Sequence, residues 1–412
     1  MTIRILQLSN EASIREQMRK IKVDPYGIRI MLPKARFYLL RINGVSNITA
    51  NILKQEMLSL GGDVAVARDA LTGCLRRTDC LMMGNLAQIE RLNQKLRKQP
   101  FGLGKIAQEL SVTLRNYQKE RFTLTCGRFK LNLGTRTHIM GIVNLTPDSF
   151  SGDGLYKKIQ NPCLAGRQAK SKIQSEVLKI VERMIEDGAD MIDIGGESTR
   201  PQARNVSVKE EISRTLPVIK RLAKRIRVPI SIDTYKPEVA KRALDAGAVM
   251  VNDIYGLRNP QMIRVVKRFE AGVIIMHMKG TPRTMQKDPR YVSLIGEIID
   301  FLSQAIRRAL DAGINRDRIV IDPGIGFGKT LEHNLKLLNS LEEFKVLGRP
   351  LLVGPSRKSF IGKILHAQPQ ERLSGTISAC VLAAHNGAKI LRVHDVKEVR
   401  QALKVFDAVS RN

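Results

Sequence analysis

The feature that most constrains the fold is a series of eight short apolar runs after residue 136. Each is followed by a Gly, Asp, Asn or Ser turn and then by an amphipathic stretch. The runs span 138–143, 189–194, 228–233, 248–254, 272–278, 318–322, 350–354 and 388–394. They are continuously apolar, which is typical of parallel strands covered by helices. Eight such strands predict an α/β fold, a (β/α)8 TIM barrel. An open doubly wound sheet is less favoured because no G-x-G-x-x-G follows the first run.

The first third of the chain has a different pattern. We predict a small α/β or α+β N-terminal domain over residues 1–135, followed by the barrel over residues 136–412. The expected elements are strands at 36–42, 63–67 and 79–83 and helices at 45–60, 86–98 and 104–118. Charged residues in this extension are spread along helix faces without a catalytic cluster, so its role is not predicted beyond structure or interaction.

The composition is that of a folded protein in a reducing compartment. Of 412 residues, 43% are hydrophobic and 26% are charged, which suffices for a large core. No apolar run is long enough to span a membrane, and Arg4 interrupts the apolar stretch at the N-terminus. The five cysteines are scattered without C-x-x-C pairs, which favours reduced thiols. We therefore predict a cytoplasmic protein without a membrane partner.

The net charge of +30 raises the possibility of anionic partners. The excess of Lys and Arg is distributed over both parts of the chain and forms no tail. Aromatic residues make up 4% and Trp is absent, so the sequence offers no platform on which bases could stack. Small anionic substrates are thus favoured over nucleic acid.

Polar residues follow the apolar runs abruptly, and in a barrel the carboxyl ends of all strands meet at one rim. Asp233, Asn252 and Asp322 would accept hydrogen bonds from a planar, N–H-rich heterocycle such as an amino-pyrimidinone ring. The predicted site therefore has an acidic pocket for a flat ring.

A second group at the same rim is cationic. Lys358, Arg392 and His394 come from the last two strands, where such barrels commonly bind phosphate, and Asn144 offers a neutral oxygen for Mg2+. A ligand with a heterocycle at one end and a diphosphate at the other would suit both groups.

The glycine-rich segment 324–330 resembles a phosphate-binding loop but does not fit its spacing. Pro323 occupies the position of the first glycine in G-x-x-x-x-G-K-[ST]. We interpret the glycines as a tight turn that brings Phe327 close to a flat ligand.

Seven segments in order resemble the signature segments of dihydropteroate synthases, within the pterin-binding enzyme family. They are 140–151 (MGIVNLTPDSFS), 193–201 (DIGGESTRP), 231–234 (SIDT), 252–254 (NDI), 322–329 (DPGIGFGK), 356–362 (SRKSFIG) and 392–394 (RVH). The resemblance covers about residues 136–410. It implies an enzyme that joins 4-aminobenzoate to 6-hydroxymethyl-7,8-dihydropterin diphosphate and releases diphosphate and dihydropteroate for folate synthesis.

The resemblance also implies residue roles. The implied pterin pocket consists of Asp233, Asn252, Met276, Asp322, Phe327 and Lys358. Lys358, Arg392 and His394 serve the pterin or its diphosphate, and these three with Asp233 are the expected catalytic residues. Asn144 is the implied Mg2+ ligand, and the family suggests a homodimer.

The first two strand-to-helix loops are expected to close over the site and to bind aminobenzoate. Their implied contributors are Pro147, Asp148, Thr199, Arg200 and Pro201, with Thr199 on the diphosphate side. Two departures concern these loops: Gln202 stands where the family more often has Gly, and the segment 154–188 is longer and more basic than usual.

The residue inventory agrees with the implied reaction, because displacement at the pterin methylene requires a stabilised leaving group and no protein nucleophile. We expect a dissociative route in which cations take up charge as the C–O bond breaks. Two alternatives remain: a pterin-dependent methyltransferase barrel that transfers a methyl group from a folate to cobalamin, and a non-catalytic, RNA-binding basic scaffold. The first would not need the segment 356–358 or the metal position at Asn144.

Overall fold

The computed structural model describes residues 2–8, 11–146, 167–198, 205–282 and 284–411. The chain divides into two compact units, Met1–Leu114 and Arg115–Asn412. The second unit contains the barrel and a short hairpin that precedes it, so the hairpin lies before the predicted boundary near residue 135 but within the barrel unit.

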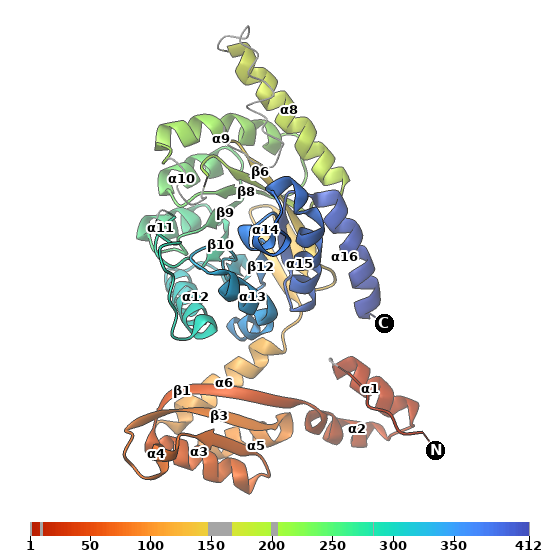
Figure 1. Ribbon diagram of the computed structural model, residues 1–412, viewed down its shortest axis with the longest axis vertical. Helices are drawn as coiled ribbons and strands as arrows, with labels where there is room; N and C mark the ends of the chain where they lie inside the picture. The colour runs from red at the N-terminus through yellow and green to blue at the C-terminus, as the bar shows by residue number, and fades with distance from the viewer. Residues whose placement is uncertain (1, 9–10, 147–166, 199–204, 283, 412) are drawn as a thin grey trace. The chain divides into compact units, whose positions relative to one another are not determined.

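The second unit is built on eight parallel strands in the order β11-β10-β9-β8-β7-β6-β13-β12 (Figure 1). They are β6 (His138–Asn144), β7 (Met191–Gly195), β8 (Ile230–Asp233), β9 (Met250–Asp253), β10 (Gly272–Met276), β11 (Ile319–Asp322), β12 (Leu352–Val353) and β13 (Ile390–Val393). A parallel bridge between Ile321 and Leu351 closes the sheet. Every predicted run contains one of these strands or overlaps it, so the predicted (β/α)8 barrel is confirmed.

Helices alternate with the strands and surround them (Figure 1). They are α8 (Arg167–Glu186), α9 (Val208–Ala223), α10 (Pro237–Asp245), α11 (Pro260–Arg268), α12 (Leu294–Asp311), α13 (Leu331–Asn339), α14 (Ser359–Leu365), α15 (Leu373–His385) and α16 (Val396–Arg411). Local sequence sets some of their ends: Ser207 caps α9 by accepting a hydrogen bond from the Glu210 amide.

The inward-facing side chains change from apolar to polar along the strands. Side chains two residues apart in a strand point to the same face. Such pairs are Met191 and Asp193, Met250 and Asn252, Val320 and Asp322, and Ile390 and Arg392. The first member of each pair belongs to one buried apolar cluster. The barrel is therefore filled with apolar side chains toward the amino ends of its strands and lined with polar ones toward the carboxyl ends.

A hairpin of β4 (Phe122–Cys126) and β5 (Phe129–Leu133) completes the apolar cluster. This hairpin was not predicted from the sequence. Gly127 supplies the turn with a φ of +52°, and Leu124 and Cys126 are fully buried against the lower layer of the barrel. The hairpin thus seals the amino-terminal end of the barrel interior.

The first unit has a three-stranded antiparallel sheet in the order β1-β3-β2. Its strands are β1 (Phe37–Ser46), β2 (Asp63–Val66) and β3 (Arg77–Asn85), and its longer helices are α3 (Asn47–Ser59), α5 (Leu86–Leu96) and most of α6 (Leu103–Tyr117), whose end from Arg115 on belongs to the second unit. The predicted strands and helices are all present. The short helices α1 (Glu11–Lys20), α2 (Pro25–Met31) and α4 (Arg68–Leu71) were not predicted.

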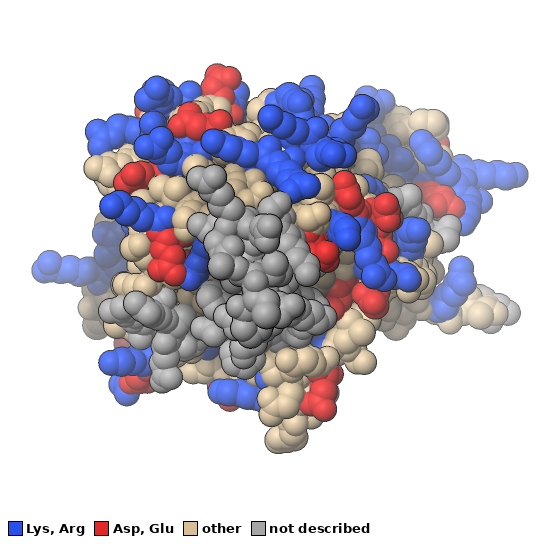
Figure 2. Space-filling model, turned by 90° about the horizontal axis from the view of Figure 1, so that it is seen from above, with Lys and Arg blue, Asp and Glu red and all other residues tan. Residues whose placement is uncertain are grey.

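Three expectations from the composition can be compared with the structure: those on membrane spans, on the thiols and on the surface charge. Within the described residues, no helix combines the length and the hydropathy needed to cross a bilayer. Cys74, Cys80, Cys126 and Cys380 are free thiols, and Cys163 lies outside the described residues. Figure 2 shows Lys and Arg spread over one face of the molecule with Asp and Glu among them, without a single basic stripe.

We expect Leu124→Ala to destabilise the barrel by about 2–5 kcal/mol, because it opens a cavity in the sealed end of the interior. The free energy of unfolding from urea denaturation followed by circular dichroism measures this. Val405→Ala, at an exposed position of α16, is the matched control and should change stability by less than about 0.5 kcal/mol. Equal stability of the Leu124→Ala and wild-type proteins would show that the hairpin is not part of the core.

Candidate functional site

The predicted site residues gather at the carboxyl ends of the barrel strands, as expected. Asn144, Asp233, Met276 and Asp322 end β6, β8, β10 and β11, Asn252 and Arg392 lie one residue before the ends of β9 and β13, and Phe327, Lys358 and His394 follow β11, β12 and β13. Pro147, Asp148, Thr199, Arg200 and Pro201 lie outside the described residues.

Arg392 on β13 bonds carboxylates on two strands, β7 and β8, that are not its neighbours in the sheet. Its Nε donates to Asp193 Oδ2 at 2.6 Å, and its Nη2 donates to Asp233 Oδ2 at 2.7 Å. Strands β6 and β7 separate β13 from β8 in the sheet, so the guanidinium reaches Asp233 through the barrel interior. Asn252 joins the same group, since its Nδ2 donates to Asp193 Oδ2 at 3.0 Å.

Asp193 is the central residue of this group, and the sequence analysis did not assign it to the site. It is fully buried in β7 and accepts from both Arg392 and Asn252. A signal was present: an acid within the apolar run 189–194 must find a cation or several donors, because a buried lone carboxylate is costly. Its partner, however, lies 199 residues away in sequence.

Two buried acceptors in this group lack a hydrogen-bond donor in the described part of the chain. Asp193 Oδ1 and Asn252 Oδ1 have no hydrogen-bond partner among the described residues. A buried acceptor without a partner costs free energy unless a ligand or water donates to it. The upper layer of the barrel is therefore prepared to receive N–H or O–H donors from a ligand.

The acids of the site have raised pKa values. Burial raises the pKa of Asp322 to about 6, although the Gly324 amide donates to its Oδ1 at 2.7 Å and Lys358 lies nearby. Burial also raises the pKa of Asp233; Arg392 opposes this shift and the neighbouring Asp193 adds to it. For Arg392, burial favours the neutral form, but Asp193 and Asp233 outweigh it and raise its pKa.

The glycine-rich segment after β11 forms a tight turn. Gly324 has a φ of +73°, and a Cβ there would lie 1.9 Å from the carbonyl oxygen of His277, so only glycine fits. The turn places Phe327 beside the second cationic residue of the site: Lys358 Nζ lies 4.1 Å from the centroid of the Phe327 ring.

A second buried pair supports this turn. Lys329 Nζ lies 3.1 Å from His277 Nδ1 and donates to the Phe327 carbonyl at 2.9 Å. Burial lowers the pKa of Lys329 to about 7 and that of His277 to about 2, so the imidazole is neutral. His277 was expected at the rim from its place at a strand end, but neither residue was assigned a role; the pair anchors the turn that carries Phe327.

His394 and the segment after β12 are joined across the last two strands. The Ser356 hydroxyl lies 3.0 Å from His394 Nδ1 and also accepts from the His394 amide at 3.2 Å. Arg357, with a φ of +55°, forms an ion pair with Asp395. These contacts hold the stretch that ends in Lys358.

A protein-family model described as pterin binding enzyme matches residues 140–394. The chain belongs to this family. The resemblance stated from the sequence motifs is therefore confirmed, and the match covers the strands whose carboxyl ends carry the site.

Relatives in this family are named as dihydropteroate synthases. One from Synechocystis is 48% identical over 290 residues, which cover 70% of this chain and 95% of the relative. A solved dihydropteroate synthase from Xanthomonas albilineans with 4-aminobenzoic acid has a TM-score of 0.63 and 40% identity, covering 71% of this chain and 99% of that one.

A third relative also spans the N-terminal unit. It is a probable bifunctional folylpolyglutamate synthase/dihydropteroate synthase from Halobacterium salinarum, 38% identical over 403 residues, which cover 96% of this chain and 45% of the relative. The first unit therefore has a counterpart in a relative that carries the barrel.

We expect the Arg392 and Asp193 side chains to be strongly coupled. Asp193→Ala should lower the free energy of unfolding by about 3–5 kcal/mol, because it removes one partner of a buried ion pair. A double-mutant cycle with Arg392→Met, measured by urea denaturation, should give a coupling energy of about 0.5–3 kcal/mol. Additive effects of the two substitutions would contradict the contact.

Proposed function

We propose that this chain is a dihydropteroate synthase, a transferase of folate biosynthesis. It joins 4-aminobenzoate to 6-hydroxymethyl-7,8-dihydropterin diphosphate and releases diphosphate. The family membership and the relatives named as dihydropteroate synthases support this assignment. The observation that carries it is the barrel mouth, in which buried acids and acceptors without a hydrogen-bond partner among the described residues lie beside Arg392 and Lys358.

In this proposal the acidic side of the mouth binds the pterin. Asp233, Asn252 and Asp322 accept hydrogen bonds from the amino and ring N–H groups, and Asp193 contributes its buried Oδ1, which has no partner among the described residues. Met276 is buried among apolar side chains that include Phe327, and it forms an apolar wall for the ring.

The cations serve the leaving group. Lys358 faces the Phe327 ring, and two of the five N–H donors of Arg392 are engaged by carboxylates, so its other donors remain for the ligand. These two residues, with His394, take up charge on the diphosphate as the C–O bond breaks, and the electron-rich pterin, with Asp233 beside it, stabilises the methylene cation that remains. The amine of aminobenzoate then forms the C–N bond at the methylene carbon and releases its proton to solvent. No protein nucleophile takes part in this route.

Aminobenzoate is proposed to bind through the first two strand-to-helix loops. Pro147, Asp148, Thr199, Arg200 and Pro201 belong to these loops, outside the described residues. The support is the resemblance of their motifs and the relative from Xanthomonas albilineans, whose structure contains 4-aminobenzoic acid.

Magnesium is proposed as the cofactor, with Asn144 as its protein ligand. Asn144 ends β6 with its Oδ1 toward Gly195, where a Cβ would come within 3.3 Å of that oxygen. No group of three or more His, Cys, Asp or Glu among the described residues could hold a metal. A single protein oxygen fits Mg2+, which often keeps several waters and binds substrate phosphates. When bound, the ion would neutralise charge on the diphosphate.

A homodimer and a cytoplasmic location complete the proposal, both resting on the sequence analysis. A methyltransferase barrel is less well supported, because it would not need the cationic segment at Lys358. A non-catalytic RNA-binding scaffold is less well supported because the polar residues at the carboxyl ends of the strands form an intact site. The low aromatic content and the dispersed surface charge also speak against nucleic acid.

We expect Arg392→Ala to lower turnover about 100- to 1,000-fold, or about 2.7–4 kcal/mol, the usual effect of removing a charge contact to a transition state. Diphosphate release from the dihydropterin diphosphate and 4-aminobenzoate, with and without Mg2+, measures this. Arg307→Ala, at an exposed position of α12, is the control and should retain wild-type turnover. Near-normal turnover of the Arg392→Ala protein would refute its assigned role. Absence of diphosphate release by the wild type would refute the proposed reaction.

Affinity for the pterin ring should fall as the solution becomes acidic. The raised pKa of Asp322, about 6, means that its carboxylate predominates above pH 6 and loses its charge below it. The Kd of 6-hydroxymethyl-7,8-dihydropterin, which lacks the diphosphate, should therefore rise between pH 7 and pH 5, by up to about tenfold per pH unit below the pKa. Pterin fluorescence reports binding, since the chain has no Trp.

Asp322→Asn is the matched variant for this experiment. It should bind the dihydropterin more weakly at pH 7 and show a flatter pH dependence, because the residue no longer titrates. A wild-type Kd that is constant from pH 5 to pH 7 would contradict the role of the acids in binding.

A further inference from the structure

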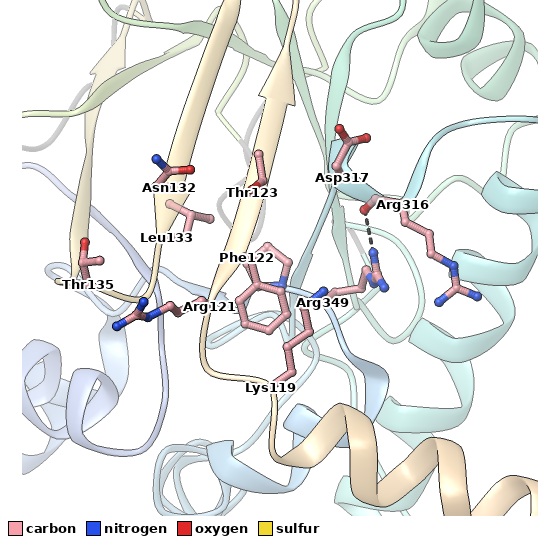
Figure 3. A pocket seen from close by; sticks show the side chains of 11 residues that line it. Lys119, Arg121, Phe122, Thr123, Asn132, Leu133, Thr135, Arg316, Asp317 and Arg349 are labelled. Atoms are coloured by element: carbon pink, nitrogen blue, oxygen red, sulfur yellow. Dashed lines mark hydrogen bonds between the residues drawn. The ribbon is translucent and has the colours of Figure 1, made fainter. Parts of the chain in front are cut away.

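A cavity of about 560 Å³ lies at the amino-terminal end of the barrel, beside the β4–β5 hairpin (Figure 3). Its walls come from the segment that precedes the hairpin, from the hairpin itself and from the residues just before β11 and β12. Cavities that bind small molecules measure about 300–1,000 Å³, so this one is large enough for a nucleotide-sized ligand.

This cavity is separate from the site described above. Arg316 and Asp317 precede β11, whereas Asp322 ends that strand. Arg349 likewise precedes β12, and Lys358 follows it. The buried apolar cluster that includes Leu124 fills the barrel interior at this end. A ligand in this cavity would therefore occupy the opposite end of the barrel from the acids and Arg392.

The lining of the cavity is strongly cationic. Lys119, Arg121, Arg316 and Arg349 line it, with one acid, Asp317. One oxygen of Asp317 already accepts a hydrogen bond from the Thr125 hydroxyl at 2.7 Å. The positive charge of the cavity is thus only partly balanced by the protein's own carboxylates.

Arg349 is the buried centre of this charge. Arg349 is only 7% exposed. Its Nη1 donates a hydrogen bond to the Arg316 carbonyl at 2.6 Å (Figure 3). Its Nε is buried and has no hydrogen-bond partner among the described residues. Burial lowers the pKa of Arg349 to about 10, and Arg316 adds to this effect while Asp317 opposes it. Such a buried guanidinium is stabilised by an anion, because its planar N–H fork matches phosphate oxygens.

An aromatic ring lies beside the cations. Lys119 Nζ is 4.8 Å from the centroid of the Phe122 ring, and the pKa of Lys119 is lowered by burial and by Arg349 and Arg316. Leu133 and Pro350 extend the apolar wall around Phe122. The cavity therefore combines an anion-binding side with an apolar side that suits a planar ring.

We propose that this cavity is a second ligand site of the protein, and that it binds a phosphorylated small molecule of nucleotide size with its phosphates at Arg349 and Arg316 and its planar ring at Phe122. The site is independent of the proposed enzymatic reaction, and its test does not depend on turnover.

Isothermal titration with ADP, at low salt and with the full chain, tests the proposal. Wild-type protein should bind ADP, and bind it more tightly than inorganic diphosphate, because only ADP carries a ring. Arg316→Glu, at an exposed position, should weaken ADP binding at least about tenfold. Arg349→Gln should do the same, and Arg121→Glu serves as a second exposed variant if the buried substitution impairs folding.

The controls separate this cavity from the rest of the molecule. Arg307→Glu makes the same charge change at an exposed position of α12 outside the cavity and should leave the Kd unchanged. Absence of ADP binding, an unchanged Kd in Arg316→Glu, or loss of ADP binding in Lys358→Ala would overturn the proposal, the last because ADP would then occupy the barrel mouth. Equal affinity for diphosphate would exclude the ring site. Tighter binding of a single-stranded RNA oligonucleotide with the same variant dependence would exclude a small-molecule ligand.

Discussion

The ion pairs of Arg392 inside the barrel are the interaction on which the rest of the site depends. One guanidinium bonds two carboxylates from β7 and β8, and one of these carboxylates also accepts from Asn252 on β9. Charges of this kind are tolerated in an interior only when their partners are held in place. The barrel supplies that constraint, because its backbone hydrogen bonds set the register of the strands that carry these residues.

The two-residue period of the strands gives the barrel a distinct apolar and a distinct polar layer. The apolar layer is sealed by the β4–β5 hairpin, which removes water from the amino-terminal end of the interior. The polar layer lies toward the carboxyl ends, where Asp193 and Asn252 each keep a buried acceptor without a partner among the described residues. Burial at this boundary raises the pKa values of Asp233 and Asp322, and the same burial makes the Arg392 pairs strong.

Loops outside the strands fix the remaining site residues by several small constraints. Gly324 allows a backbone turn that a residue with a Cβ could not make. Lys329 stabilises that turn through its contact with His277 and its hydrogen bond to the Phe327 carbonyl. Phe327 then lies where it contacts Lys358. At the other end of the barrel, the unbalanced charge around Arg349 shows that the same scaffold can present a second, chemically different cavity.

The sequence by itself determined the barrel, since eight continuous apolar runs followed by amphipathic stretches have few other ways to bury both faces. It also determined that Asp233, Asn252, Asp322 and Arg392 share one rim, because the carboxyl ends of parallel strands meet there. Only the tertiary structure decided which of these side chains touch. Asp193 and Arg392, which form an ion pair, are 199 residues apart in the sequence, and Phe327 contacts Lys358 from a different loop. Such contacts depend on strand order and barrel closure, which the sequence patterns do not specify. The Arg349 cavity also arises from packing, which local sequence patterns do not encode. The hairpin, in contrast, had a local signal, because apolar and polar residues alternate on both sides of Gly127.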